Sequence, residues 1–351
     1  MSDRTSDVLV IGAGIIGLSL ALELNRRGIS VRVFDRSEPG REASHAGAGM
    51  LAAKDPDTPE ALRPLLLASG EMYPAWVAAI EEASGIRVDL RKEGTIYLTS
   101  QNREGLESWS EEQLAEREPR SKWSGQVFFT DEGSVDPRAL MAATLASAKK
   151  SGIVVSHEHP VSGIDVIDGR VTGVRVGDKT ENAGIVVNCA GAWAQKIVGA
   201  HTPSHPVKGQ MLAVVDPHDR TPVLRHVVRG DEVYLVPRSD GRILIGATVE
   251  KVGFDKRVNP QVILGMQHAA AELVPRIAEM RIQESWAGLR PGSPDKLPLL
   301  GETSVKGYFA AAGHYRNGIL LAPITARIMA DLLTGATTGV DVSRFTPKRF
   351  S

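Results

Sequence analysis

Residues 7–35 read DVLVIGAGIIGLSLALELNRRGISVRVFD, and this stretch decides the fold. A short aliphatic, β-branched run ends at Gly12, as a buried parallel strand does. Residues 15–27 then place aliphatic side chains on one helical face and charged side chains on the other. Residues 31–35 form a second apolar run. The stretch therefore predicts a strand–helix–strand unit with two parallel strands.

The segment Gly12-Ala13-Gly14-Ile15-Ile16-Gly17 matches G-x-G-x-x-G where the strand turns into the helix. The first glycine permits the tight turn, the second lets a pyrophosphate approach the backbone, and the third lets the helix pack on the strand. Phosphates would meet free N–H groups at the positive end of the helix. Asp35 ends the second strand, where a carboxylate accepts hydrogen bonds from ribose hydroxyls and repels a 2′-phosphate. The pattern predicts FAD or NAD rather than NADP, although Arg36 beside it would suit NADP.

Three later features favour FAD over NAD. The next strand of the same sheet is expected at residues 185–191 (IVVNCAG), so a large insertion splits the nucleotide domain. Residues 41–51 are mostly small and suit an extended cofactor that passes close to the backbone. Residues 311–318 precede a predicted helix over 320–333, whose positive end would face the electron-rich edge of a reduced isoalloxazine ring.

The remaining pattern is mixed, without an internal repeat, low-complexity tract or linker. Helices are predicted over 59–83, 104–117, 137–150 and 259–280, short strands over 95–99, 126–130 and 308–312, and an all-strand passage over 153–190 with a turn at Asp168-Gly169. The domains are therefore expected to interleave. We assign residues 1–80, 145–200 and 288–351 to an FAD-binding domain, and residues 81–144 and 201–287 to a substrate-binding domain.

Composition excludes several classes of protein. Forty-one Lys and Arg residues nearly balance 42 Asp and Glu residues, which argues against a nucleic-acid binder and an acidic disordered tail. The single cysteine, Cys189, forbids an intrachain disulfide and a cysteine-based zinc site, and fits a reducing, cytoplasmic compartment. His201 and His205 are four residues apart, but Pro203 between them and Pro206 after them prevent a helix that would align both rings, so no metal site is expected. No apolar run reaches the ~20 residues that span a bilayer, so no membrane partner is expected.

Four motifs together resemble the glycine oxidases, the thiamine-biosynthesis branch of the D-amino acid oxidase family. They are Gly12–Gly17, residues 44–51 (SHAGAGML), residues 286–291 (WAGLRP) and residues 313–323 (GHYRNGILLAP), and the resemblance spans essentially the whole chain. It implies an α/β fold, in which a Rossmann-like FAD-binding domain of the glutathione-reductase type is interleaved with an α+β substrate domain built on an antiparallel sheet. It also implies non-covalent FAD, molecular oxygen as electron acceptor, and a homotetramer.

The expected reaction is oxidative deamination of glycine, sarcosine or D-alanine to the 2-oxo acid, ammonia or amine, and hydrogen peroxide. Covalent relatives attach flavin through a cysteine near the C-terminal region, whereas Cys189 lies in a predicted strand, so a covalent link is not expected. The residues expected to bind FAD are Gly12, Gly14, Ile15, Ile16, Gly17, Asp35, Arg36, Ala43, Ser44, Ala48, Gly49, Met50, Val161, Gly191, His314, Tyr315, Arg316, Asn317, Gly318, Ile319 and Leu320.

For the substrate, Arg290 is the expected carboxylate clamp, because a guanidinium offers two parallel charge-assisted hydrogen bonds. The resemblance places it at the family's carboxylate-binding arginine, and makes Tyr234 a second donor to the same carboxylate. Arg316 would close the pocket and Met50 would lie beside the flavin ring. No side chain stands out as a base, so positioning and electrostatics are expected to carry most of the rate.

Three alternatives remain open: an amino-acid dehydrogenase that passes electrons to a quinone, a non-catalytic flavin-binding subunit, and a nicotinamide dehydrogenase. The first needs a membrane-docking element, which is not evident, and the last is opposed by the split nucleotide domain. Glu232 stands where glycine oxidase relatives can carry a histidine, which leaves the ranking of substrates open.

Overall fold

The computed structural model describes residues 6–217 and 222–351. The opening stretch forms the predicted unit of β1 (Val8–Ile11), α1 (Ile15–Arg26) and β2 (Val31–Phe34), and β1 and β2 pair in parallel. Helix α1 stops just before Gly28, whose φ of 81° suits a residue without Cβ.

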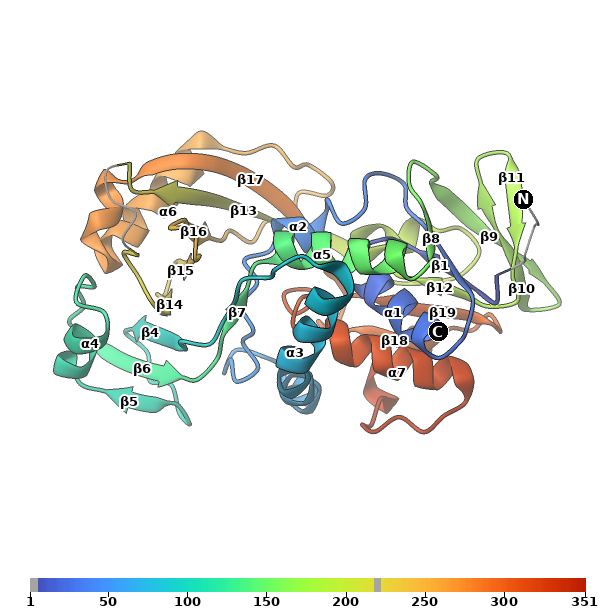
Figure 1. The fold of residues 1–351 in the computed structure, drawn as a ribbon, viewed down its shortest axis with the longest axis horizontal. Helices are drawn as coiled ribbons and strands as arrows, with labels where there is room; N and C mark the ends of the chain where they lie inside the picture. The colour runs from blue at the N-terminus through green and yellow to red at the C-terminus, as the bar shows by residue number, and fades with distance from the viewer. Residues whose placement is uncertain (1–5, 218–221) are drawn as a thin grey trace.

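This unit forms the centre of a six-stranded sheet with the order β18-β19-β12-β1-β2-β8 (Figure 1). The added strands are β8 (Val154–Ser156), β12 (Val186–Asn188), β18 (Leu299–Glu302) and β19 (Tyr308–Ala312). All neighbours are parallel except β18 and β19. Strand β12 lies directly beside β1, and a long insertion does follow β2, but the next strand of this sheet along the chain is β8 rather than the predicted strand at residues 185–191, because Val154–Ser156 pairs with the open edge of β2.

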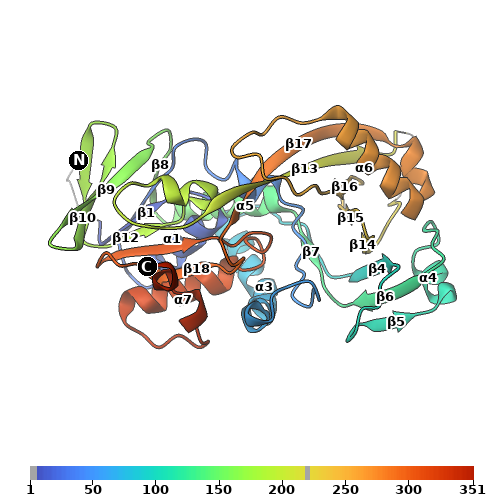
Figure 2. The same cartoon turned by 180° about the vertical axis from the view of Figure 1, so that it is seen from behind.

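Two different layers cover this sheet. Helices α1, α3 (Arg63–Ser84), α5 (Pro137–Lys150) and α7 (Ala322–Thr334) pack on one face around an aliphatic core. The other face is covered by an antiparallel sheet of β9 (Val161–Ile167), β10 (Arg170–Val176) and β11 (Lys179–Asn182), as Figure 2 shows from behind. The predicted turn at Asp168-Gly169 joins β9 to β10, and both residues have positive φ.

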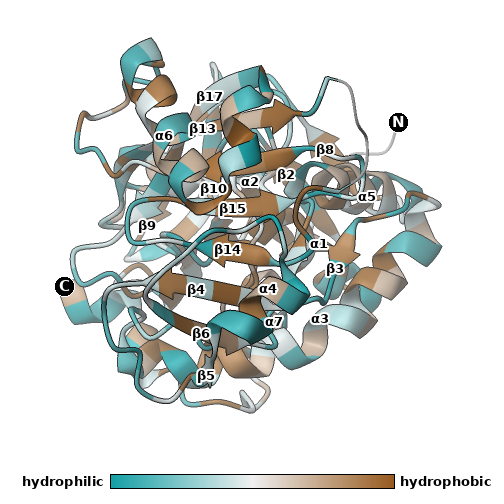
Figure 3. Ribbon diagram, turned by 90° about the vertical axis from the view of Figure 1, so that its left-hand side faces the viewer, coloured by the Kyte–Doolittle hydropathy of each residue, from teal (hydrophilic) through white to brown (hydrophobic). Residues whose placement is uncertain are grey.

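An eight-stranded sheet lies beside these layers, with the order β17-β13-β16-β15-β14-β4-β6-β5. Its strands are β4 (Thr95–Thr99), β5 (Glu107–Trp109), β6 (Gln126–Thr130), β13 (His205–Val215), β14 (Val227–Arg229), β15 (Tyr234–Pro237), β16 (Ile243–Gly246) and β17 (Arg281–Gly292). Neighbours are antiparallel except β4 and β14. Several of these strands are strongly apolar in Figure 3, and α6 (Pro260–Leu273) packs against the sheet.

Short elements complete the chain. They are α2 (Ala43–Ala46), α4 (Glu111–Arg117), β3 (Leu90–Arg91), β7 (Ser134–Val135), and the 3-10 helices η1 (Glu60–Leu62), η2 (Gly191–Lys196), η3 (Pro275–Glu279), η4 (Ser343–Phe345) and η5 (Pro347–Phe350). The predicted α/β fold class is therefore confirmed, with a parallel sheet between helices and a small sheet, joined to an antiparallel sheet.

The helix predicted over 104–117 is wrong in its first half. Residues 107–109 form β5 instead, because Trp109 stacks on Phe129 of β6 with ring centroids 4.4 Å apart. Ser110 then caps α4 through a reciprocal hydrogen-bonded pair with Gln113, so the helix starts later. The helix predicted over 259–280 is also interrupted, since α6 ends at Leu273 and η3 follows.

The domain boundaries assigned from the sequence stay a prediction. Helix α5 packs against α1 and α3, although residues 137–144 were placed in the substrate-binding domain. Strand β17 crosses the assigned boundary at residue 288 without a break.

Candidate active site

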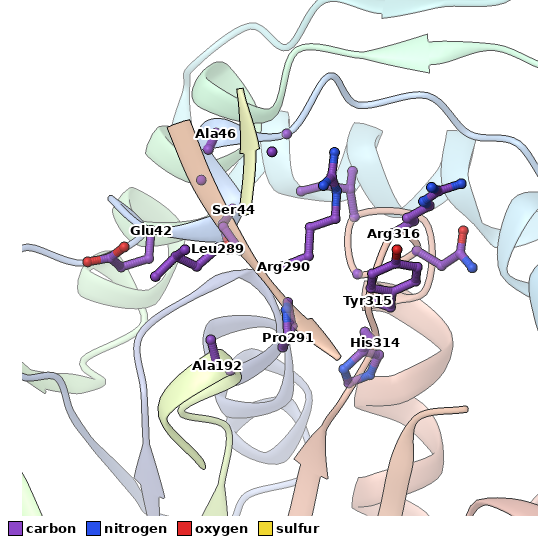
Figure 4. A pocket seen from close by; sticks show the side chains of 18 of the residues that line it. Glu42, Ser44, Ala46, Ala192, Leu289, Arg290, Pro291, His314, Tyr315 and Arg316 are labelled. Atoms are coloured by element: carbon purple, nitrogen blue, oxygen red, sulfur yellow. The ribbon is translucent and has the colours of Figure 1, made fainter. Parts of the chain in front are cut away.

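A cavity of about 500 Å³ runs between the parallel sheet and the eight-stranded sheet. It is lined at one end by the glycine-rich turn and Asp35, and at the other by Tyr234 and Arg290. A cavity of this size is typical of sites for cofactors and small ligands. Residues from both halves of the fold therefore share one site (Figure 4).

The nucleotide end begins at the turn between β1 and α1. Gly12 has a φ of 106°, and a Cβ there would lie 2.8 Å from the carbonyl carbon of Cys189. A Cβ on Gly17 would collide with the Gly12 carbonyl oxygen, so this glycine lets the helix approach the strand. The Ser44 hydroxyl accepts a hydrogen bond from Ile15 N–H at 3.0 Å and joins the turn to α2.

Asp35 lies beside this turn at the end of β2. Its Oδ2 accepts from Ala13 N–H at 2.6 Å, and its Oδ1 accepts from Ser37 N–H at 3.0 Å. Burial raises the pKa of Asp35, although these backbone hydrogen bonds act in the opposite direction. Two carboxylate oxygens have about four acceptor sites, so capacity remains for ribose hydroxyls.

Arg36 stacks on the Trp193 ring at the nucleotide end of the cavity. Its guanidinium lies 3.7 Å from the ring centroid of Trp193, and its Nη2 donates to Glu42 Oε1 at 2.8 Å. Phe254 lies next to Trp193 with ring centroids 5.2 Å apart. Trp193 lines the cavity but was missed by the sequence analysis, although its position two residues after Gly191 is a signal that could have found it.

The small residues that follow β2 are held by the eight-stranded sheet. Trp286 Nε1 donates to the Ala46 carbonyl at 3.0 Å, and Arg238 Nη2 donates to the Ala48 carbonyl at 2.5 Å. A Cβ on Gly288 would collide with the Ala46 side chain, so the two segments are in close contact. Burial lowers the pKa of Arg238 to about 10.

Residues 313–321 connect β19 to α7, and we call this segment the final loop. It closes the middle of the cavity. Tyr315 N–H donates to the Pro291 carbonyl at 2.8 Å, which fixes this loop to the end of β17. His314 is buried beside Thr325, with Nε2 and Oγ1 3.1 Å apart, and burial lowers its pKa to about 3. Arg316 is exposed, with its guanidinium 5.3 Å from the Tyr315 ring centroid, and both residues lie beside Arg290 in Figure 4.

Arg290 projects from β17 into the cavity (Figure 4). Its Nη1 donates to the Thr248 carbonyl at 2.9 Å and to the Lys208 carbonyl at 3.3 Å. Neither acceptor is a carboxylate, so these bonds orient the guanidinium without neutralising its charge. A Cβ on Gly209 would lie 2.5 Å from Nη1, so the guanidinium occupies the space that this glycine leaves.

Tyr234 is the first residue of β15, and it lies near Arg290. Its hydroxyl donates to Met211 Sδ at 3.8 Å, and a Cβ on Gly246 of the neighbouring strand would lie 2.7 Å from that hydroxyl. Burial raises the pKa of Tyr234, while the Arg290 cation acts to lower it. Met50 packs in the same apolar group, beside Met211 and Tyr234.

The sequence analysis also missed a set of charged residues where the cavity passes the eight-stranded sheet. Arg229 pairs with Asp55 at 2.9 Å and donates to the Tyr97 hydroxyl at 3.0 Å, and all three line the cavity. Nearby, Arg103 pairs with Asp57 at 2.8 Å. No local motif joins these residues, which are far apart in the chain, so only the folded structure shows them as a group.

Most of the predicted site residues line this one cavity. They are Gly12, Gly14, Ile15, Ile16, Asp35, Arg36, Ala43, Ser44, Ala48, Gly49, Met50, Val161, Gly191, Tyr234, Arg290, His314, Tyr315, Arg316, Asn317, Gly318 and Ile319. Gly17 and Leu320 do not line it. Gly17 faces β1, and Leu320 is buried, with its carbonyl accepting from the Ser69 hydroxyl at 2.6 Å.

These residues fit FAD. Helix α1 offers first-turn amides at the glycine-rich turn, where a pyrophosphate is favoured. Asp35 stands where a ribose would follow, and the cavity continues past the small residues of α2 to the final loop. Cys189 also lines the cavity, but burial raises the pKa of its thiol, which opposes thiolate chemistry.

Comparisons with known proteins agree with this site. The family model described as FAD dependent oxidoreductase (DAO) matches residues 7–332. The chain therefore belongs to this family of FAD-dependent oxidoreductases, and it is an enzyme that uses FAD.

Its relatives are more specific. The chain is 34% identical to a glycine oxidase of Geobacillus kaustophilus over 98% of this chain and 97% of that one. It superimposes on a crystal structure of glycine oxidase from Geobacillus kaustophilus with a TM-score of 0.92, at 33% identity and with 99% of each chain covered. It is 36% identical to the bifunctional protein ThiO/ThiG of Synechocystis over 99% of this chain, but it spans only 54% of that relative's length.

The part of the chain that the structure describes shows neither a candidate metal site nor a helix that could span a membrane. No group of three or more His, Cys, Asp or Glu residues within 6–217 and 222–351 is arranged to hold a metal ion. Within the same ranges, no helix has the length and apolar character needed to cross a bilayer.

Proposed function

We propose that this protein oxidises glycine, and other small amines such as sarcosine and D-alanine, with molecular oxygen as the electron acceptor. Glycine, water and oxygen would give glyoxylate, ammonia and hydrogen peroxide. The observation that carries the proposal is that the Arg290 guanidinium and the Tyr234 hydroxyl line the same cavity as the glycine-rich turn and the final loop. The likeness to glycine oxidases over nearly the whole chain supports the same reaction.

The proposed substrate end suits a small amino acid. Arg290 would take the carboxylate in two charge-assisted hydrogen bonds, and Tyr234 would donate a third. Apolar side chains of Met50, Met211 and Ala247 surround Tyr234, which favours a substrate with little or no side chain. Arg316, exposed beside Tyr315, would cover the bound substrate.

FAD, when bound, would accept a hydride from the substrate Cα and pass the electrons to oxygen. The task of the chain is to hold the carboxylate so that Cα faces the flavin, which replaces a bimolecular encounter with a fixed geometry. A neutral substrate amine supplies the electron pair that assists loss of the hydride, so no residue needs to act as a base. His314 does not serve as one in this proposal, because it is buried against Thr325.

A substrate panel tests the proposal. Purified protein should be yellow, release intact FAD on denaturation, and form hydrogen peroxide with glycine in detergent-free buffer. The panel should contain glycine, sarcosine, D-alanine and L-alanine, with peroxide release and oxygen consumption measured together. A colourless protein that ignores added FAD, or no peroxide with any of these amines, would refute the proposal.

The same panel distinguishes the alternatives. A dehydrogenase would reduce an added quinone analogue but would consume no oxygen, and a non-catalytic subunit would bind FAD without turnover. Arg290 and Tyr234 argue against a subunit without turnover, because a non-catalytic protein has no need of a carboxylate clamp.

We further propose a role in thiamine biosynthesis, by the resemblance to the branch that serves that pathway. A homotetramer is proposed on the same basis. A cytoplasmic location is proposed because the chain has one cysteine, which is buried. Light scattering of the purified holoprotein would test the oligomeric state directly.

A further inference from the structure

A polar group adjoins Arg290, and none of its members lines the cavity. It consists of Lys208 and Gln210 on β13, and of Thr248 and Glu250 in the segment after β16, and we call it the Glu250 group. The proposed reaction assigns no role to any of these side chains, and all four belong to the part of the chain that the structure describes.

Glu250 is the centre of the group. Its Oε1 accepts from the Thr248 hydroxyl at 2.5 Å and from Gln210 Nε2 at 2.8 Å, and its Oε2 lies 3.2 Å from Lys208 Nζ. The backbones of Lys208 and Glu250 also exchange two N–H···O hydrogen bonds, both 2.9 Å long. One carboxylate therefore holds three side chains, and the backbone hydrogen bonds pair the two segments.

Two members of the group are withdrawn from water, whereas the Glu250 side chain is 28% exposed. The Lys208 side chain is only 6% exposed, and Gln210 is buried. A buried ammonium is costly unless a charged partner compensates it, and Glu250 supplies that charge. Burial opposes ionisation of Glu250, but the contacts with Thr248, Gln210 and Lys208 outweigh it and hold the pKa of the carboxyl below its usual range.

The same residues fix the Arg290 guanidinium. Its Nη1 donates to the carbonyls of Thr248 and Lys208, two of the three residues whose side chains Glu250 holds. The Thr248 hydroxyl also accepts from Gln210 N–H at 2.9 Å, so the Thr248 side chain is also bonded directly to β13. If Thr248 turned, the guanidinium would lose its shorter hydrogen bond and could rotate over Gly209.

We infer that Glu250 is a positioning residue, which orients Arg290 for the substrate carboxylate by holding the carbonyls of Thr248 and Lys208 in place. The inference rests on the proposed function, because it takes Arg290 as the carboxylate clamp. Glu250 does not line the cavity. Its effect reaches the carboxylate only through Arg290.

The test uses holoenzyme with Glu250→Gln and acetate as the probe. Acetate keeps the carboxylate of glycine but has no amine to oxidise, and its binding is followed by the change in flavin absorbance. We expect the dissociation constant for acetate to rise about tenfold. The KM for glycine should rise by a similar factor while kcat stays within about twofold, because the clamp holds ground state and transition state alike.

A matched control lies away from the site. Glu302 pairs with Lys348 at 3.3 Å, and neither residue lines the cavity. Glu302→Gln weakens another glutamate–lysine ion pair and should leave acetate binding and KM unchanged. If Glu250→Gln does not give folded holoenzyme, Thr248→Val carries the test, because it removes the hydroxyl link and leaves the pair of Lys208 and Glu250 intact.

A double-mutant cycle separates positioning from simple stabilisation. In an Arg290→Ala background, Glu250→Gln should lower kcat/KM for glycine by less than twofold, because the residue through which it acts is gone. An undiminished loss in that background would overturn the inference, as would unchanged acetate binding in Glu250→Gln or Thr248→Val. Failure of the wild-type holoenzyme to bind acetate or oxidise glycine would instead refute the clamp itself, and with it both proposals.

Discussion

The Arg290 guanidinium lies directly over Gly209 of the neighbouring strand, where a Cβ would stand 2.5 Å from Nη1 and 2.6 Å from Cζ. Strands β17 and β13 pair with Val207 opposite Arg290, so Gly209 is two positions along and faces the same side of the sheet. The proposed clamp is therefore built from two residues, one that supplies the charge and one that leaves room for it.

Gly209→Ala is the sharpest test of this relationship. The methyl group would displace the guanidinium, and a displacement near 1 Å can cost about a hundredfold in rate. We expect kcat/KM for glycine to fall by about that factor, while FAD content stays unchanged. Gly265→Ala, in an open position on α6, is the control and should leave kinetics unchanged. Normal kinetics for Gly209→Ala would show that Arg290 does not hold the substrate in this position.

Removal of the proposed clamp should be at least as costly. Arg290→Ala should lose about 2–3 kcal/mol of transition-state binding, roughly a hundredfold in kcat/KM, because a charge-assisted pair is lost. Steady-state oxygen consumption with glycine measures this. Arg257→Ala removes an exposed arginine that pairs with Asp255, and should not change the rate. Unchanged kinetics would remove Arg290 from the substrate site.

Asp35 should govern FAD affinity without governing catalysis. Asp35→Ala removes the proposed ribose acceptor and the acceptor for Ala13 N–H, and hydrogen bonds to a charged group contribute about 1.5–3 kcal/mol. The dissociation constant for FAD should rise by about ten- to a hundredfold, as measured by recovery of flavin fluorescence on dilution. Asp165→Ala, at the far side of the parallel sheet, is the matched control. Tight FAD binding in Asp35→Ala would place the ribose elsewhere.

His314 should make stability depend on pH. The folded protein keeps His314 neutral down to a pKa of about 3, whereas the unfolded chain protonates near the ordinary value of 6.5. Between these values the unfolded state binds the extra proton, so the free energy of unfolding falls as pH drops through this window. His314 would contribute a slope of about 1.4 kcal/mol per pH unit. The slope is about half as large at pH 6.5 and disappears above about pH 7.5.

Urea unfolding of the holoprotein between pH 4.5 and 6.5 measures this slope. His314→Gln should reduce it by about 1.4 kcal/mol per pH unit, because glutamine does not titrate. His268→Gln, on the exposed face of α6, controls for loss of a histidine in general. An unaltered slope in His314→Gln would mean that His314 is protonated in the folded protein as readily as in the unfolded chain.

Local sequence predicted most of the residues that line the cavity near the glycine-rich turn, although it missed Trp193. The turn at Gly12–Gly17, the acidic residue at the end of β2 and the small residues of 41–51 each express a backbone requirement within a few residues. Such requirements are readable because glycine, strand alternation and helix periodicity act over short distances. The late strand β12 was also predicted, since an aliphatic run that ends in Asn-Cys-Ala-Gly repeats the pattern of β1.

The segment 104–117 shows where local reading failed. Its charge pattern is compatible with a helix. In the structure, however, Trp109 stacks on Phe129 of β6. Tertiary packing outweighs propensity when an aromatic ring gains a buried surface. Local patterns also do not show which distant residues meet in the fold. The ion pair of Arg229 and Asp55 was missed for this reason, because its two members lie far apart in the chain.

By itself, the sequence determined the βαβ unit, the phosphate-binding turn, the family resemblance and the identity of Arg290 as a candidate clamp, because each depends on neighbouring residues or on a quoted motif. The tertiary structure alone decided what surrounds that arginine: Gly209 beneath it, the carbonyls of Thr248 and Lys208 that orient it, and Glu250 behind them. These contacts join strands that are dozens of residues apart. Such pairing depends on sheet register, which no local pattern encodes.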